Sequence, residues 1–310
     1  MDGSDRLSRR RFLGGAIAAG AAGVLMPSLV TAGQGPADAG DKTPAWQIGC
    51  YTRPWAAHEY RVAFDAIAEA GLRYVGLMTT KSATGLVISA ATPVDEARQV
   101  GEEAAKRGLA IASVYGGDIP VRESLQAAVE ALRRLVDNCE AARAAGLLLG
   151  GTGDAALQGT YYKAVAECCD YAAAKHVGLS AKPHGGLNAT GPQCRKIIER
   201  VGHKNLRLWY DPGNIYYYSD GQLDPVADAA TVDGLVVGMS VKDYKHPRNV
   251  DVTPGTGQVN FPAVLARLKQ GGFTGGPLIV ETLAPGDPAQ TLAEARKARR
   301  FLEELTGQKG

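Results

Sequence analysis

The chain has 310 residues, of which 45% are hydrophobic and 21% are charged, and its formal net charge is +2. This composition is ordinary for a globular protein, and the length allows one large core or two modest domains, because α/β barrels often reach about 250 residues as one unit. The 39 glycines are spread along the chain, which indicates many tight turns and excludes a low-complexity sequence.

The first 32 residues resemble an export signal. Residues 8–13 (SRRRFL) are similar to the twin-arginine motif, an apolar stretch follows over 16–30, and Val30-Thr31-Ala32 offers small residues for cleavage. The apolar stretch is too short and too rich in glycine to be a good membrane span. We therefore expect a periplasmic or other extracytoplasmic protein that the twin-arginine export machinery carries, with no stable membrane span after cleavage. Cleavage within residues 37–39, or a basic tail before an amphipathic or membrane helix, is the alternative.

Removal of residues 1–32 takes away four arginines and two aspartates, so the formal net charge falls from +2 to 0. A neutral mature chain has no basic excess for nucleic acid, and we expect no such partner.

Segment 33–45 is rich in Gly, Pro, Ala and Asp and is predicted to be a linker, and residues 307–310 are predicted to be a tail. The cysteines are odd in number and lack zinc-site spacing, which favours buried free thiols; they are Cys50, Cys139, Cys168, Cys169 and Cys194.

From residue 46 onward, short β-rich runs alternate with longer helical patterns. The predicted strands are 46–51, 72–78, 109–115, 147–151, 178–184, 206–211, 235–243 and 278–281. The predicted helices lie near 58–70, 94–107, 122–145, 159–177, 191–202, 224–230, 260–271 and 288–306. Gly71, Gly108 and Gly178 stand between a helical pattern and the next strand, where glycine accepts the left-handed conformation that ends a helix.

Eight such units predict an α/β fold, a single (β/α)8 TIM barrel over residues 46–306. An open doubly wound sheet is the competing fold. That fold would have a phosphate-binding, glycine-rich turn after its first strand, and residues 49–53 do not supply one. The sequence therefore favours the barrel.

Polar side chains stand at the ends of the last four predicted strands, although the strands themselves are mostly apolar. A closed barrel brings all these ends to one mouth, and a charged residue that closes a buried run is costly unless it is paired, coordinated or solvated. A shared site is therefore predicted for Lys182, His184, Asp211, Asn214, Lys242, Asp243 and Glu281.

Some of these residues have simpler interpretations. Lys242 and Asp243 would also suit a solvated pair on a loop, and Asn214 would suit a helix cap. After the first strand, Arg53, Trp55 and His58 are expected to form a wall of the mouth that suits sugar rings and acid groups. The alternative there is a surface loop covered by the tryptophan.

The sequence resembles the sugar phosphate isomerase/epimerase family of xylose isomerase-like TIM barrels over roughly residues 46–306. The motifs that carry the resemblance are KPHGG (182–186), DPGN (211–214), VKD (241–243), GTGQVNF (255–261) and VE (280–281). Members usually hold one divalent metal (Mn, Mg, Co or Zn) with Glu, Asp, His and Glu from strands five to eight, and the two glutamates usually shuttle a proton between neighbouring sugar carbons.

This chain departs from that pattern at half of the ligand positions. Asp211 and Glu281 match the second and fourth ligands, but Lys182 stands where the first Glu is expected and Ser240 where the His is expected. Asn214 also replaces a His that is common in the family. An ammonium group cannot bind a cation and would repel one held close by.

Two hypotheses follow. In the first, His184 helps Asp211 and Glu281 to hold a metal in a rearranged site, and Lys182 touches a substrate oxygen. In the second, Lys182 replaces the metal as the local positive charge, pairs with one of the carboxylates and polarises a substrate carbonyl. The second is favoured because the new lysine and the lost histidine both argue against a metal.

The predicted reaction is proton abstraction next to the carbonyl of a keto sugar or related polyol, leading to isomerisation, epimerisation or β-elimination. Glu281 is the predicted base, and Lys182 or His184 would stabilise the enediolate oxygen or return the proton. The residues predicted to bind the carbohydrate are Arg53, Trp55, Asn214, Lys242 and Asp243. Two alternatives remain: a lyase that forms a Schiff base through Lys182, and a non-catalytic carbohydrate-binding barrel.

Overall fold

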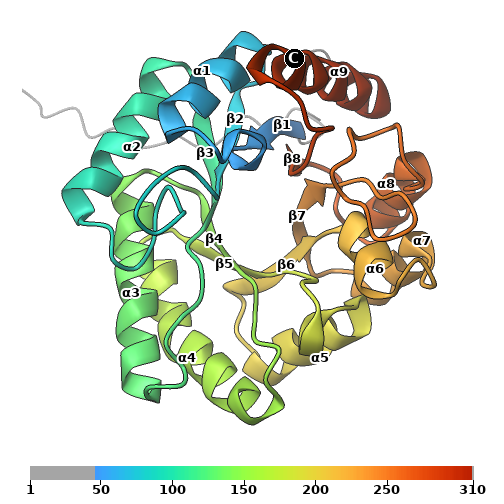
Figure 1. The fold of residues 1–310 in the computed structure, drawn as a ribbon. Helices are drawn as coiled ribbons and strands as arrows, with labels where there is room; N and C mark the ends of the chain where they lie inside the picture. The colour runs from blue at the N-terminus through green and yellow to red at the C-terminus, as the bar shows by residue number, and fades with distance from the viewer. Residues whose placement is uncertain (1–45, 309–310) are drawn as a thin grey trace, which may run out of the picture. The chain divides into compact units, whose positions relative to one another are not determined.

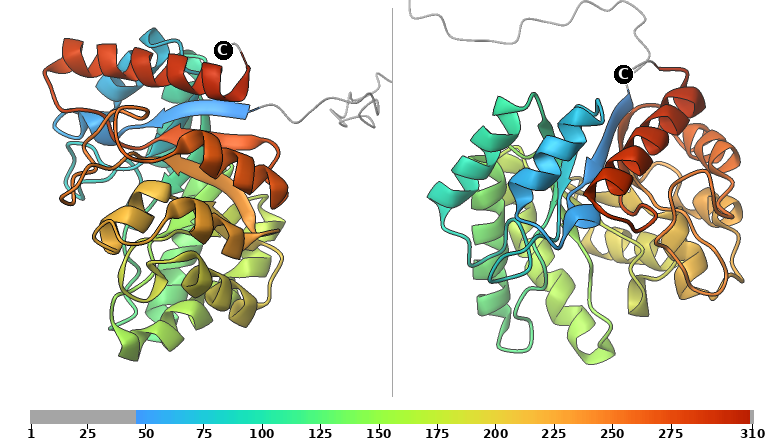
Figure 2. Two further views of the ribbon diagram at one scale, coloured as in Figure 1. Left: turned by 90° about the vertical axis from the view of Figure 1, so that its right-hand side faces the viewer. Right: turned by 45° about the horizontal axis from the view of Figure 1, so that its top comes forward.

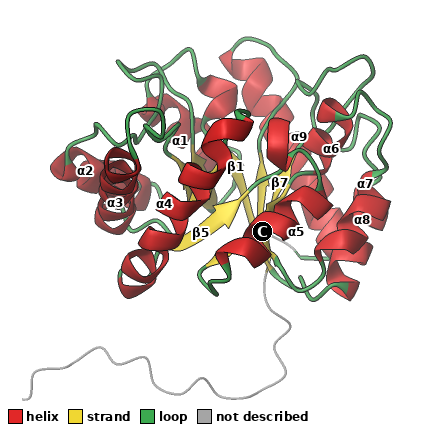
Figure 3. Ribbon diagram, turned by 90° about the horizontal axis from the view of Figure 1, so that it is seen from below, coloured by secondary structure: helices red, strands yellow, loops and turns green. Residues whose placement is uncertain are grey.

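The computed structural model describes residues 46–308; the predicted signal peptide (1–32) and linker (33–45) lie outside them. Eight parallel strands follow one another around a closed barrel in chain order, and β1 pairs with both β2 and β8. The helices form an outer ring around the strands (Figures 1 and 3). The structure thus confirms the predicted single (β/α)8 TIM barrel.

All eight predicted strands are present. Their bounds are β1 Trp46–Tyr51, β2 Tyr74–Leu77, β3 Ala110–Tyr115, β4 Gly146–Leu149, β5 Gly178–Ala181, β6 Leu206–Tyr210, β7 Val236–Val241 and β8 Gly276–Val280. The strands β2, β5 and β7 are shorter than predicted. Each gives way to irregular backbone at the carboxyl end of the strand.

The outer ring contains the eight predicted helices and one more. The helices are α1 Tyr60–Glu69, α2 Val94–Lys106, α3 Leu125–Ala141, α4 Ala155–Ala174, α5 Gly191–Val201, α6 Pro212–Tyr218, α7 Pro225–Ala229, α8 Phe261–Gln270 and α9 Pro288–Thr306. Helix α6 was not predicted, since it is only seven residues long and begins directly after β6. Short 3-10 turns are η1 Arg53–Trp55, η2 Gly186–Asn188 and η3 Ala230–Val232.

Two of the three glycines predicted to end helices do so. Gly71 and Gly108 have φ values of 82° and 70°, which is the left-handed region. The prediction for Gly178 was wrong: His176 takes the left-handed conformation after α4, with φ of 57°, and Gly178 begins β5.

The barrel interior is filled by side chains that point inwards from the strands or from the residue that follows a strand. Tyr51, Met78, Ala112, Leu148, Trp209 and Ile279 form this inner core, while a second and larger core lies between the strands and the helices. All five cysteines are buried free thiols, as predicted. Within residues 46–308, we find no helix with the length and apolar character needed to cross a bilayer.

The strand register sets the level of the site. Val241 pairs with Val280, so Lys242 and Glu281 both stand one residue beyond their strands. Lys182 likewise follows Ala181, the last residue of β5. The long loops after β2, β3 and β7 lie together at this end of the barrel, opposite the end where β1 begins (Figure 2).

Candidate active site

Two lysines and two carboxylates meet at the carboxyl ends of β5, β6, β7 and β8. Lys182 Nζ lies 2.9 Å from Asp211 Oδ2 and donates a hydrogen bond to Glu281 Oε2. Lys242 Nζ lies 3.4 Å from Asp211 Oδ2 and 2.5 Å from Glu281 Oε1. None of the four side chains is more than 3% exposed. Each lysine therefore contacts both carboxylates inside the protein.

The charged neighbours decide which of these buried groups stay ionised, because burial alone favours the neutral form of each. Burial would raise the pKa of Glu281, but Lys182, Lys242 and Arg53 hold it well below its usual range. Burial would lower the pKa of Lys182, but Asp211 and Glu281 raise it above its usual value. For Lys242 burial prevails, and its pKa is lowered. Lys182 is thus the firmly held cation, and Lys242 loses its proton more readily.

Arg53, which begins the 3-10 turn after β1, adds a fifth charge. Its NH1 nitrogen lies 3.1 Å from Glu281 Oε1, and its side chain is 36% exposed whereas that of Glu281 is 2% exposed. The cluster then has three cationic groups against two carboxylates, which leaves one excess positive charge. A surplus of this sign stabilises an anion that forms on a bound molecule.

Asn214 supports the charged cluster from behind. Its side-chain NH2 donates to the carbonyl of Pro183 at 2.7 Å, and its Oδ1 accepts from Lys242 Nζ at 3.0 Å. The alternative interpretation of Asn214 as a helix cap was wrong, since Asp211 caps α6 by accepting from the Asn214 amide at 2.9 Å. Both side-chain polar atoms of Asn214 are therefore engaged, and its visible role is to hold Lys242.

Asp243 is fully buried and organises the loop after β7. Its carboxylate accepts backbone N–H groups from Tyr244 at 2.8 Å, Gly255 at 3.0 Å, Gly257 at 2.7 Å and Val259 at 3.0 Å. The alternative of a solvated Lys242–Asp243 pair was wrong, because both side chains are buried. The substrate contact predicted for Asp243 stays a prediction, and the structure gives this residue a structural role.

A cavity of about 150 Å³ opens onto the cluster. Lys182, Glu281, Arg53 and His184 line its polar side, and the other residues that line it are Met78, Thr79, Tyr115, Leu148 and Gly150. Lys242 is not among them, so it acts on the cavity through Glu281. A small cavity with one apolar wall and a few convergent polar groups is the usual form of a ligand site.

His184 lies at the solvent side of this cavity, between two tyrosines. The ring centroids are 6.2 Å from Tyr115 and 6.1 Å from Tyr218. Desolvation in the mouth, together with the charges of Lys182 and Lys242, lowers the pKa of His184 to about 4. Its ring is therefore neutral at physiological pH and is able to accept a proton. The prediction that this strand extends to His184 was wrong, since β5 ends at Ala181, although Lys182 and His184 both line one cavity.

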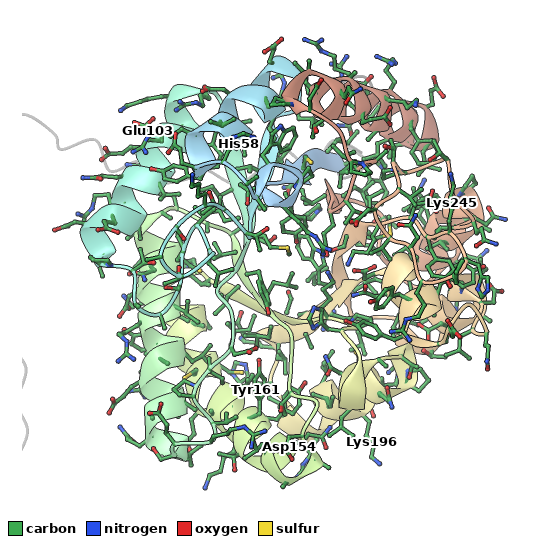
Figure 4. All side chains as sticks on the ribbon, in the orientation of Figure 1. His58, Glu103, Asp154, Tyr161, Lys196 and Lys245 are labelled. Atoms are coloured by element: carbon green, nitrogen blue, oxygen red, sulfur yellow. The ribbon has the colours of Figure 1, made fainter. Side chains whose placement is uncertain are left out.

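The predicted wall after β1 is only partly present. Arg53 reaches the cavity, but Trp55 is 2% exposed and is absent from its lining. His58 lies away from the barrel axis, and its carbonyl accepts hydrogen bonds from Thr80 and Lys81 (Figure 4). The structure thus shows Trp55 as part of the packing beneath the turn, which corresponds to the alternative interpretation.

The residues present do not fit a divalent metal. Only Asp211 and Glu281 supply carboxylate donors at the centre, and the ammonium groups of Lys182 and Lys242 stand between them. Across residues 46–308, no three His, Cys, Asp or Glu side chains are grouped to hold a metal ion, and the rearranged site predicted from Asp211, Glu281 and His184 is not seen among them. The hydroxyl of Ser240 accepts from Trp209 at 3.1 Å inside the barrel.

Sequence reasoning missed the wall of the cavity opposite the charges. Thr79, Tyr115 and Gly150 come from loops or strand ends on the first half of the barrel. None of them is charged, and none belongs to a motif. The available signal was their position at the end of a predicted strand or directly after one.

The chain matches the model of the xylose isomerase-like TIM barrel family over residues 64–305, and it therefore belongs to that family. A probable L-ribulose-5-phosphate 3-epimerase from Mycoplasma pneumoniae is 30% identical over 116 residues. That match covers 36% of this chain and 37% of the relative, so the chain spans little more than a third of the relative's length.

Solved structures with similar folds cover most of the chain. A xylose isomerase domain protein from Planctomyces limnophilus has a TM-score of 0.67 at 19% identity, over 84% of this chain and 98% of that one. A D-psicose 3-epimerase from Clostridium cellulolyticum, solved with D-tagatose, has a TM-score of 0.65 at 13% identity, over 84% and 99%. At these identities the likeness shows the fold.

Proposed function

We propose that this protein is a sugar isomerase or epimerase that moves a proton next to the carbonyl of a keto sugar, with Lys182 in place of a metal ion. The observation that carries the proposal is the position of the Lys182 ammonium, which contacts Asp211 and Glu281 and lines the same cavity as Glu281 and His184. Family relatives named as sugar epimerases support a keto sugar as the substrate.

Each residue at the cavity has a role in this reaction. Lys182 donates a hydrogen bond to the substrate carbonyl and stabilises the enediolate oxygen as charge develops on it. Glu281 takes the proton from the neighbouring carbon. His184, which is neutral in the free protein, takes up a proton from solvent and delivers it to the carbon from the other side of the cavity, and Glu281 later releases the abstracted proton to solvent. Return to the opposite face of the same carbon gives epimerisation, and return to the adjacent carbon gives isomerisation.

The low pKa of Glu281 has a function in this scheme. In the free protein three cations hold the Glu281 carboxylate, which makes it a weak base. When a substrate oxygen takes over the hydrogen bond from Lys182, one of those cations is turned away from Glu281. The basicity of Glu281 then rises only when substrate is in place, while Lys242 and Arg53 keep the carboxylate oriented.

Schiff-base catalysis through Lys182 is a weaker alternative. An amine must lose its proton before it attacks a carbonyl, and the two carboxylates raise the pKa of Lys182. Lys242 has a lowered pKa but does not line the cavity. A non-catalytic carbohydrate-binding barrel would not need two buried lysines in a shared ion cluster, whose desolvation is costly. The raised pKa of Lys182 and the costly burial of two lysines therefore favour acid–base chemistry over these two alternatives.

We also retain the proposal that the chain works outside the cytoplasm after twin-arginine export. The motif over residues 8–13 and the neutral charge of the remaining chain support it. A fusion of residues 1–45 to a reporter that is active only after export in the folded state would test this. Replacement of Arg9 and Arg10 by Lys should abolish export, and export that persists would contradict the assignment.

Deuterium exchange tests the proposed reaction whatever its product. The protein is incubated in D2O with D-fructose, D-tagatose, D-psicose or L-ribulose, and NMR follows the loss of the protons next to the carbonyl. We expect enzyme-dependent exchange on at least one ketose. Binding of these sugars without exchange would instead identify a carbohydrate-binding barrel. Exchange that is equal with and without the protein would reject the proposal.

A further inference from the structure

A second and larger cavity adjoins the proposed catalytic one. Its volume is about 440 Å³, and it lies among the loops that follow β3, β4 and β5. His184 and Gly150 line both cavities. A Cβ atom added at Gly150 would lie 3.3 Å from His184 Nδ1. The absence of a side chain at Gly150 therefore leaves room for the His184 ring where the two cavities adjoin.

The two cavity volumes indicate that the cavities suit different parts of a substrate. Pockets for small molecules usually measure about 300–1,000 Å³. The catalytic cavity, at about 150 Å³, is below this range, and the adjoining cavity lies within it. The first cavity is therefore small for anything beyond one sugar ring, and the second has room for a further group on the far side of His184.

The second cavity offers hydrogen bonds for a neutral, hydroxylated group. Tyr161 is 3% exposed and accepts the backbone N–H of Gly151 at 3.3 Å, so its own hydroxyl proton is free to be donated. Burial raises the pKa of Tyr161, which keeps that proton in place. The neighbouring loop 150–153 adds backbone groups and the hydroxyl of Thr152. Tyr161 and Asp154 both lie on the α4 side of the barrel (Figure 4).

The charges of the second cavity disfavour a phosphate. Its basic side chain, Arg122, already forms an ion pair with Asp154 at 2.9 Å. Asp118 and Glu123 line the same space, and both would repel an anion. The local chemistry therefore suits a neutral sugar ring and disfavours a phosphate or an acidic group as the occupant.

We propose that the substrate is a glycosylated keto sugar, with its keto ring at Lys182 and its second sugar ring in the cavity bordered by Tyr161 and residues 150–153. The inference rests on the proposed function for the identity of the reacting ring. It adds that recognition comes mainly from the second ring, because the larger cavity provides most of the available space.

Gly153 offers a direct test. Gly153 lines the second cavity, and a Cβ added there meets nothing within 4 Å, so a large side chain has room to occupy part of that cavity. Gly159 is the matched control, because its Cβ position is equally open but it lies on α4 and does not line the cavity. The two variants are Gly153→Trp and Gly159→Trp in the full chain.

Calorimetry compares D-fructose with its glycosylated forms turanose, lactulose and palatinose, which carry the second ring at different positions. We expect at least one disaccharide to bind at least about tenfold more tightly than D-fructose, which is about 1.4 kcal/mol. Gly153→Trp should bring that ratio close to one, and Gly159→Trp should preserve it. Equal binding of all four sugars, or a ratio that survives in Gly153→Trp, would overturn the inference.

Deuterium exchange separates this outcome from failure of the proposed reaction. If a disaccharide binds through the second cavity but no sugar exchanges its protons, the recognition inference stands and the reaction is wrong. If D-fructose exchanges while the disaccharides bind no more tightly, the reaction stands and the inference is wrong.

Discussion

Replacement of Lys182 by Met isolates the contribution of its charge. Methionine keeps an unbranched side chain of similar length, so the change removes mainly the ammonium that bridges Asp211 and Glu281. Loss of one partner from a buried ion pair usually costs about 3–5 kcal/mol. Lys242 and Arg53 still contact Glu281, so we expect the lower end, about 3 kcal/mol.

Lys182→Met is also expected to lower turnover strongly. Removal of one preorganised donor to a developing oxyanion typically lowers kcat by about 10²–10³. Lys182→Met should therefore lose about that factor in deuterium exchange while it remains folded at 25 °C. Lys196→Met is the matched control, because Lys196 is exposed on α5 and points away from the barrel (Figure 4).

Urea unfolding and exchange on the same samples separate stability from catalysis. Exchange by Lys182→Met within about threefold of the unaltered chain would refute the electrophilic role, because threefold is well under 1 kcal/mol of barrier. Loss of activity through unfolding alone would not support the electrophilic role. Lys182→Arg serves as a second variant, because it restores a cation and should recover stability more fully than turnover.

Four further predictions follow from the same contacts. The purified protein should contain no stoichiometric Mn, Mg, Co or Zn by elemental analysis, and chelators should leave exchange unchanged; a stoichiometric, exchange-supporting metal would refute the lysine hypothesis. Borohydride with substrate should leave no adduct on Lys182 in a mass spectrum, and a trapped adduct would establish the Schiff-base alternative. Asp243→Asn should lower the free energy of unfolding by about 2–3 kcal/mol, since hydrogen bonds to a charged acceptor are lost, and an unchanged urea midpoint would contradict this. His184 has a folded pKa of about 4, below its usual value, so the unfolded chain binds more protons between these values. The free energy of unfolding should therefore fall as the pH drops from the usual pKa of histidine to about 4. His184→Gln should make the free energy of unfolding less dependent on pH in this range, and an unchanged dependence would contradict the lowered pKa of His184.

The periodic parts of the molecule could be predicted from the sequence, because strand–helix alternation is a local signal. Barrel closure then places Lys182 beside Glu281, although 99 residues separate them. The register of β7 on β8 brings Lys242 to the same level. To predict these contacts, it is enough to know the order of the strands and which residue stands at the end of each one.

Other features depend on three-dimensional detail that local patterns do not carry. A carboxylate that accepts four backbone N–H groups, such as Asp243, has the same sequence appearance as one that faces a substrate. The uncharged wall formed by Thr79 and Tyr115 has no motif. Strand ends are equally hard to predict, because the residues that leave β5 do so to place Lys182 against the carboxylates.

The charge balance explains why the two carboxylates remain when the ligand set is broken. In the pattern that the sequence resembles, a Glu stands at the position of Lys182 and the site holds a divalent cation. Exchange of Glu for Lys adds two positive charges, which equals the charge of one divalent ion. Asp211 and Glu281 thus keep a compensating charge in a buried setting, where unpaired carboxylates would be costly. In the proposed reaction the ammonium, as part of the chain, would also stay fixed at the point where the enediolate oxygen forms.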